Sequence, residues 1–142
     1  MRRFLEAQAN ADPDALEELL APDFVDHSLQ PDQEPGREGF IGSVAEEPAI
    51  FSNLRATIDD QVAEGDKGTT RFTWRRIHDR GEFLGLAPTG MEIKTTAIVI
   101  YRVSGGKIVE EWSESTGVLE ATRQRLEQEK IERERIESRS YS

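Results

Sequence analysis

Residues 92–115 read EIKTTAIVIYRVSGGKIVEEWSES, two stretches rich in β-branched and aromatic residues on either side of Gly105-Gly106. A Gly-Gly pair supplies the positive φ angles that a tight β-hairpin turn needs. The first stretch is apolar at every position from Ala97 to Ile100, which is typical of a central strand covered on both faces. We therefore predict two antiparallel strands, over residues 92–103 and 107–115.

Two further strands are expected before this hairpin. Apolar residues recur on one side of residues 54–62, at Leu54, Ala56, Ile58 and Val62, with polar residues between them. This period of two is the signature of a half-buried strand. A turn at 64–67 then leads into a second long strand over 69–79.

The chain before residue 51 favours helices. Residues 2–9 are predicted to form a short helix, and Asp12-Pro13 starts another, with Asp as N-cap and Pro in the first turn. Residues 24–27 read as a short strand, residues 30–37 as a loop, and 38–51 as a third helix that Pro48 ends or kinks. Helices followed by hairpin-linked strands indicate an α+β fold, in which a curved antiparallel sheet wraps around the helices and encloses a pocket.

The sequence changes character after Gly117, where LEATRQRLEQEKIERERIES is dense in charge and in good helix formers. Leu119 and Leu126 lie seven residues apart, but Arg133 occupies the next heptad position, so no sustained coiled coil is predicted. A solvated helix that packs one stripe on a neighbour is favoured over a dimerisation arm; the stripe comprises Val118, Leu119, Thr122 and Leu126. We expect one domain over 1–117 and a charged helix and tail over 118–142.

Composition excludes several functional classes. The 142 residues fit one domain, and 28 acidic against 18 basic residues give a net charge of −10. Such a charge argues against binding to nucleic acid or to an anionic membrane. The absence of cysteine excludes disulfides, thiolate metal sites and cysteine nucleophiles. No apolar run could span a bilayer and the first residues lack a signal-peptide h-region, so a soluble cytoplasmic protein is expected.

Strand periodicity suggests a catalytic pair. Alternate residues of the 69–79 strand share a face that Phe72 and Trp74 mark as inward, and this face ends in His78. In the same way, Ile108 and Trp112 mark one face of the last strand as inward; that face also holds Glu110, Glu114 and Thr116. An inward imidazole and an inward carboxylate, His78 and Glu114, could form an acid–base pair, because burial tunes both groups toward neutral pH.

Asp26-His27 is a second candidate. Adjacent residues of a strand point to opposite faces, so only one of the two can enter a pocket, and His27 could equally be a structural hydrogen-bond donor. The two histidines have neither HxH nor HExxH spacing, so no metal is expected. Phosphate-binding glycine motifs and a nucleophile elbow are also lacking, and no cofactor is predicted.

Several segments, in order, resemble one known family: APDFVDHSL (21–29), GREGF (36–40), HDRGEFLGLAPTG (78–90) and IVIYRVSGGKIVEEW (98–112). They are similar to the SnoaL-like polyketide cyclases, often described as ester cyclases, of the nuclear transport factor two-like superfamily. The resemblance covers roughly residues 1–119. It implies a cone-shaped, cystatin-like roll with a ligand pocket between sheet and helices, and a homodimer that pairs through the open face of the sheet.

The activity that the resemblance implies is cofactor-independent aldol ring closure of a polyketide ester, although relatives include hydroxylase-like and isomerase members. The family's catalytic aspartate lies four residues after the tryptophan, where this chain has Thr116. The segment HDRGEF is also one residue longer than the family's usual form.

Two hypotheses follow from these observations. In the first, the protein is a cyclase- or isomerase-type enzyme on a hydrophobic carbonyl substrate, with His27, His78 and Glu114 as catalytic residues. The substrate-binding residues would then be Phe72, Trp74, Tyr101, Trp112, Thr116 and Asp26. In the second, it is a non-catalytic ligand-binding or dimeric scaffold domain.

Overall fold

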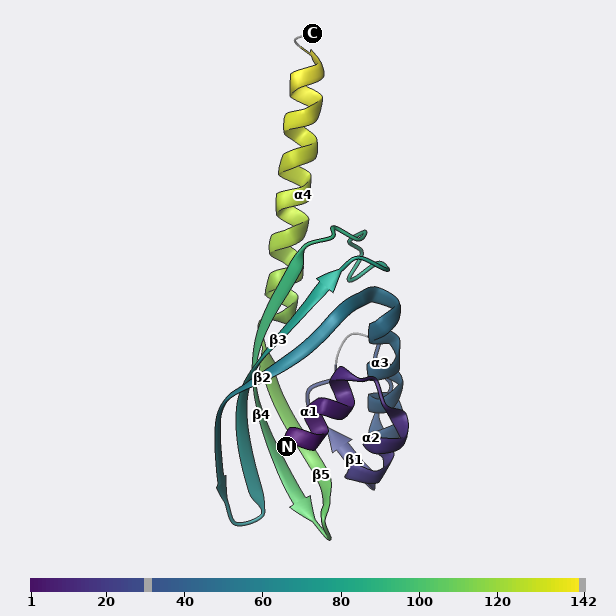
Figure 1. Ribbon diagram of the computed structural model, residues 1–142, viewed down its shortest axis with the longest axis vertical. Helices are drawn as coiled ribbons and strands as arrows, with labels where there is room; N and C mark the ends of the chain where they lie inside the picture. The colour runs from purple at the N-terminus through teal and green to yellow at the C-terminus, as the bar shows by residue number, and fades with distance from the viewer. Residues whose placement is uncertain (30–31, 141–142) are drawn as a thin grey trace.

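A computed structural model gives the structure of the chain; it describes residues 1–29 and 32–140, and all of their side chains except those of 118–121 and 140. The described residues form four helices and one five-stranded sheet (Figure 1). The helices are α1 (Arg2–Ala9), α2 (Pro13–Leu19), α3 (Gly36–Ile50) and α4 (Gly117–Ser140). The strands are β1 (Leu20–Asp26), β2 (Phe51–Glu64), β3 (Lys67–His78), β4 (Glu92–Ser104) and β5 (Lys107–Ser115).

The sheet has the order β1-β5-β4-β3-β2. Strands β2 to β5 form an antiparallel meander, and β1 runs parallel to β5 at the edge. The predicted hairpin of residues 92–115 is confirmed, as is the α+β class. Strand β1 begins at Leu20, four residues earlier than predicted, directly after α2.

Local signals in the helical region hold. Asp12 caps α2, because its Oδ1 accepts a hydrogen bond of 3.2 Å from the backbone N–H of Ala15, and Pro13 occupies the first turn. Pro48 lies in the last turn of α3, which ends two residues later at Ile50. The loop predicted for 30–37 lies partly outside the described residues, at 30 and 31; Gly36 and Arg37 already belong to α3.

Helices α1 to α3 cover one face of the curved sheet, which we call the inner face (Figure 1). Leu5 of α1 packs there against Phe72, Ala97 and Val99. The other, outer face carries no helix: Ile98 and Ile100 of β4 are 47% and 41% exposed. The expectation that this central strand is covered on both faces is therefore wrong for the single chain.

Helix α4 extends beyond the body of the molecule along its longest axis (Figure 1). Its first turns contact the loop between β3 and β4, where Thr89 and Gln124 form a hydrogen bond and the Arg125 guanidinium donates to the carbonyl of Leu84. The predicted apolar stripe is wrong at Leu126, which is 61% exposed, and Thr122 is exposed too; the side chains of Val118 and Leu119 lie outside the described part. The buried residue of this segment is Gln124, since the loop that it meets is polar.

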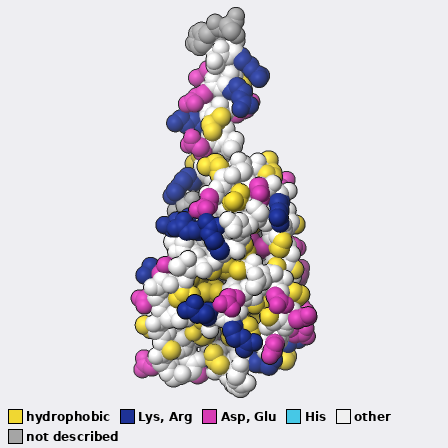
Figure 2. Space-filling model, viewed as in Figure 1, with side chains coloured by type: hydrophobic (Ala, Val, Ile, Leu, Met, Phe, Trp, Pro, Cys, Tyr) yellow, Lys and Arg dark blue, Asp and Glu magenta, His cyan; other side chains and the backbone are white. Residues whose placement is uncertain are grey.

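Blue and magenta side chains alternate along the projecting part of α4 (Figure 2). Acidic and basic residues are equally frequent over 117–142, so the net charge of −10 belongs to the first 116 residues. None of the helices within residues 1–29 and 32–140 is long and apolar enough to cross a membrane.

Candidate functional site

A β-bulge in β5 determines which side chains face the helices. Val103 pairs with Ile108 and Arg102 with Glu110, so Val109 is an extra residue without a partner on β4. One extra residue exchanges the two faces of a strand. Ile108 and Glu111 consequently both face inward, whereas Glu110, Trp112 and Glu114 face outward. The prediction that Glu114 and Trp112 point into the pocket is wrong for this reason.

The outward residues form their own cluster. The rings of His27 and Trp112 stack in parallel with centroids 4.6 Å apart, and His27 Nε2 lies 3.4 Å from Glu110 Oε2. A hydrogen bond of 2.7 Å from Arg102 also reaches Glu110 and lowers the pKa of its carboxyl. Glu114 is exposed and pairs with Ile98 on the outer face. The structure therefore does not bring His27, His78 and Glu114 together.

Thr116, at the position of the family's aspartate, closes the end of the β4–β5 ladder. Its hydroxyl oxygen accepts from the backbone N–H of Thr96, and its own N–H donates to the Thr96 carbonyl, both at 3.0 Å. The backbone of β4 thus occupies this hydroxyl.

Two carboxyl groups face each other's strands on the inner face. Asp26 of β1 pairs with Glu111 of β5, and both are buried. The Asp26 carboxylate accepts hydrogen bonds from the Ser28 N–H at 2.9 Å and from Gln33 Nε2 at 3.0 Å. Within the described part of the chain, Glu111 Oε2 has no hydrogen-bond partner.

Burial, reinforced by the negative charge of Asp26, raises the pKa of Glu111 to about 8. Glu111 therefore carries a proton at neutral pH, beside a carboxylate that accepts two hydrogen bonds. This pair can donate a proton from one side chain and accept one at the other. Periodicity missed Glu111, although the doublet Glu110-Glu111 guarantees that one of the two points inward.

His78 faces inward, as the alternation along β3 predicted, and it is fully buried. Its Nε2–H donates to the Gly81 carbonyl at 2.6 Å, and its backbone N–H donates to Met91. Its carbonyl accepts from the N–H groups of Thr89 and Gly90. These bonds hold both ends of the loop between β3 and β4, which gives His78 a positioning task in the motif that carries it.

Arg76, two residues earlier on the same face, forms a buried ion pair with Glu47 of α3 at 3.0 Å. Its guanidinium carbon lies 4.1 Å from the ring centroid of Phe51 and 5.2 Å from that of Phe83. Burial raises the pKa of Glu47 and lowers the pKa of Arg76, so desolvation outweighs their mutual attraction.

The predicted aromatic residues of the inner face are where β3 and β4 alternation places them. Phe72 is buried and meets Trp74 edge to face at 5.6 Å, and Tyr101 packs against both apolar clusters. The Tyr101 ring lies against Gly68 on the neighbouring strand, in space that a Cβ atom would fill.

Two hollows border α1 on this side of the sheet. One, of about 90 Å³, is lined by Leu5, Ala56 and Ile58 among others. The second, of about 150 Å³, lies at the end of α3 and is lined in part by Glu47 and Phe51. Both are smaller than the roughly 300–1,000 Å³ typical of pockets for drug-sized ligands, so a larger ligand requires α1 to shift.

Buried polar atoms without partners concentrate on the inner face. Within the residues described, four buried side-chain atoms lack a hydrogen-bond partner: Arg76 Nε, His78 Nδ1, Thr95 Oγ1 and Glu111 Oε2. All four come from inward positions of β3, β4 and β5. Because proteins rarely leave such atoms unsatisfied, this face is polar in a way that packing alone does not require.

Known proteins share this architecture. TsrD of Streptomyces laurentii is 30% identical, with a TM-score of 0.77 over 87% of this chain and 90% of that one. IdmH of Streptomyces antibioticus, a candidate polyketide cyclase, is 35% identical, with a TM-score of 0.72 over 82% of this chain and 89% of that one. A Catenulispora acidiphila protein with a ketosteroid isomerase-like fold is 22% identical over 80% of this chain and 82% of its own, at a TM-score of 0.63, and shows the fold alone.

No protein with a curated description matches the chain. The SnoaL-like polyketide cyclase family, in contrast, matches over residues 1–125, which include the sheet, the three N-terminal helices and the start of α4. The chain belongs to the SnoaL-like polyketide cyclase family.

Proposed function

We propose that the protein is a cofactor-independent enzyme that moves protons on a hydrophobic carbonyl compound, in a cyclase- or isomerase-type reaction. The observation that carries this proposal is the buried pair of Asp26 and Glu111, one group accepting hydrogen bonds and the other protonated at neutral pH. Such a pair replaces the aspartate that this chain lacks at Thr116.

The chemistry balances without a co-reactant. Asp26 takes a proton from the carbon next to a carbonyl, while the proton of Glu111 is donated to the carbonyl oxygen, which yields an enol. In an aldol closure the enol carbon then bonds to a second carbonyl carbon of the same molecule, and the alkoxide formed there receives a proton. Asp26 returns its proton at the end, so both carboxyl groups regain their starting states.

The proposal is tested by deuterium uptake at the acidic CH₂ of 2-tetralone in D₂O, followed by NMR. Removal of a proton next to a carbonyl is the step that aldol cyclases and ketone isomerases share, so the assay needs no knowledge of the natural substrate. We expect the wild-type protein to accelerate exchange, and Glu111→Gln and Asp26→Asn each to slow it by about 100-fold or more.

Glu110→Gln is the matched control, because Glu110 is adjacent in sequence and faces outward. It should exchange at the wild-type rate. If Glu114→Gln abolishes exchange and Glu111→Gln does not, the catalytic carboxylate is the one that periodicity indicated. If the wild-type protein does not accelerate exchange at all, the alternative of a non-catalytic binding or scaffold domain is favoured.

We also propose that the chain forms a homodimer through the outer face of the sheet. The exposed Ile98 and Ile100 lie side by side on a central strand, and Ile100 pairs with Trp112 of β5. Apolar side chains in the middle of an otherwise charged sheet face support burial against a second copy.

A further inference from the structure

The second polar centre of the inner face lies at the opposite end from Glu111. Arg76 of β3 pairs with Ile93 of β4, and Thr95, one inward position away, pairs with Trp74. Glu111 pairs with Tyr101. Six residues of β4 separate Tyr101 from Thr95, or roughly 20 Å of extended strand.

Arg76 has one donor that the protein itself does not use. Its terminal nitrogen Nη1 donates to Glu47 at 3.0 Å, whereas its buried Nε–H has no partner among the described residues. Thr95 Oγ1, at a diagonal cross-strand position, is buried and equally without a partner there. Diagonal neighbours on a sheet are about 7–8 Å apart at their Cα atoms, close enough for both side chains to reach one ligand oxygen.

The surroundings decide which kind of oxygen fits. Glu47 already neutralises Arg76, and burial acts against both charges. A further anion would leave a net negative charge in an apolar site, which is costly. A neutral carbonyl oxygen accepts the Nε–H without adding charge. The rings of Phe51 and Phe83 flank this site, and a hollow of about 150 Å³ borders Phe51 and Glu47.

We infer that Arg76 Nε, with Thr95 Oγ1, binds a carbonyl oxygen of a planar, apolar ligand, and that this oxygen is a second carbonyl, remote from the one that Asp26 and Glu111 act on. The inference rests on the proposed function for the reacting carbonyl only. It assigns the substrate to elongated compounds with carbonyl groups near both ends and an apolar middle, which would lie over Phe72, Ala97 and Val99.

The test compares 1-indanone with indane, which has the same ring system without the oxygen. Binding of each is followed by NMR of the ¹⁵N-labelled full chain, including the Arg76 Nε–H signal. One hydrogen bond should make the ketone bind about tenfold more tightly than the hydrocarbon. The Arg76 Nε–H signal should shift with 1-indanone and not with indane.

Arg76→Lys keeps a positive charge opposite Glu47 but removes the Nε–H, so it should bind both compounds equally, with indane affinity unchanged. Arg75→Lys is the control: Arg75 is adjacent and faces outward, where it pairs with Glu92. It should keep the full preference for the ketone.

Equal affinities in the wild-type protein, or a preference that survives in Arg76→Lys, would overturn the inference, and so would failure of both compounds to bind. Each of these results leaves the deuterium exchange of Glu111→Gln to be judged separately. Loss of exchange in that variant combined with no ketone preference would retain the proposed function and remove the second carbonyl site.

Discussion

Glu111 couples the stability of the protein to pH. Its pKa is about 8 in the folded chain and near 4.5 when unfolded, so the folded state binds the additional proton between these values. The contribution of this group is therefore complete below about pH 4.5 and is lost as the pH rises through 8. We predict that the free energy of unfolding falls by a few kcal/mol from about pH 5 to pH 9, measured by urea titration.

Glu111→Gln should remove most of this dependence, because the amide has no proton to lose, and should be the more stable variant at the alkaline end. Glu110→Gln, whose carboxyl lies on the outer face beside Arg102, is the control and should retain the slope. A slope that is equal in Glu111→Gln and in the wild-type protein would mean that Glu111 is not the protonated group.

At this scale some residue roles could be predicted from sequence and others could not. The Asp12 cap and the inward side of Phe72, Trp74 and His78 follow from rules that involve only near neighbours. The roles of Asp26 and His27 stayed open, because a strand fixes that one of them faces inward and not which one. Their pairing partners on β5 make the distinction.

At the scale of elements, the four strands of the meander are evident in the sequence, whereas the bulge in β5 is not. Val109 is apolar and sits beside Ile108, so it suits either face and breaks no visible pattern. The register of β4 against β5 is a property of two strands together, and a bulge of one residue is enough to reverse all inward positions that follow it. The candidate site was misassigned for that single reason.

Deletion of Val109 tests the bulge directly. Because Val109 has no partner on β4, its removal turns the ladder into a regular one and leaves Glu111 facing inward. We predict a native fold with a loss of about 1 kcal/mol and an unchanged pH dependence of stability. Deletion of Ser113, which pairs with Val99, is the matched control and should cost several kcal/mol, because it turns Glu114 toward the core. Equal losses in the two variants, measured by urea titration, would show that Val109 is an ordinary ladder residue.

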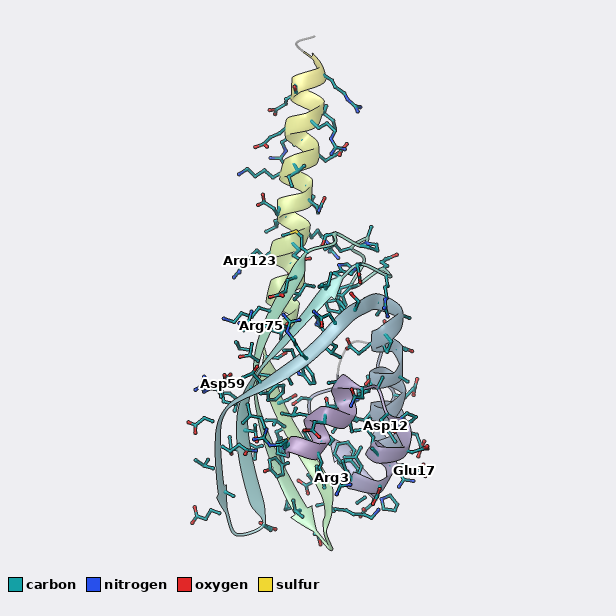
Figure 3. The ribbon with its side chains drawn as sticks, viewed as in Figure 1. Arg3, Asp12, Glu17, Asp59, Arg75 and Arg123 are labelled. Atoms are coloured by element: carbon teal, nitrogen blue, oxygen red, sulfur yellow. The ribbon has the colours of Figure 1, made fainter. Side chains whose placement is uncertain are left out.

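At the scale of the whole molecule, three helices cover the inner face and leave the outer face to solvent. Side chains such as Asp59 and Arg75 lie on the uncovered side of the sheet (Figure 3). The charged outer residues surround Ile98 and Ile100, and the resemblance to a dimeric superfamily is the one feature of the sequence that anticipated an exposed apolar centre. Composition could not do so, because a residue buried by a partner and one buried within its own chain leave the same pattern of apolar positions in β4.

The dimer proposed for this face has a definite test against the alternative of association through α4. We predict that the wild-type chain has the mass of a dimer by light scattering at micromolar concentration, and that Ile98→Glu/Ile100→Glu has the mass of a monomer, since the substitution would bury two charges at the centre of the interface. Leu126→Glu changes an exposed apolar residue of α4 and should remain a dimer. Because each copy carries a net charge of −10, added salt should strengthen the dimer by screening repulsion between the copies. A monomeric wild-type chain would overturn the proposal, and a monomeric Leu126→Glu together with a dimeric sheet variant would instead assign the interface to the charged helix.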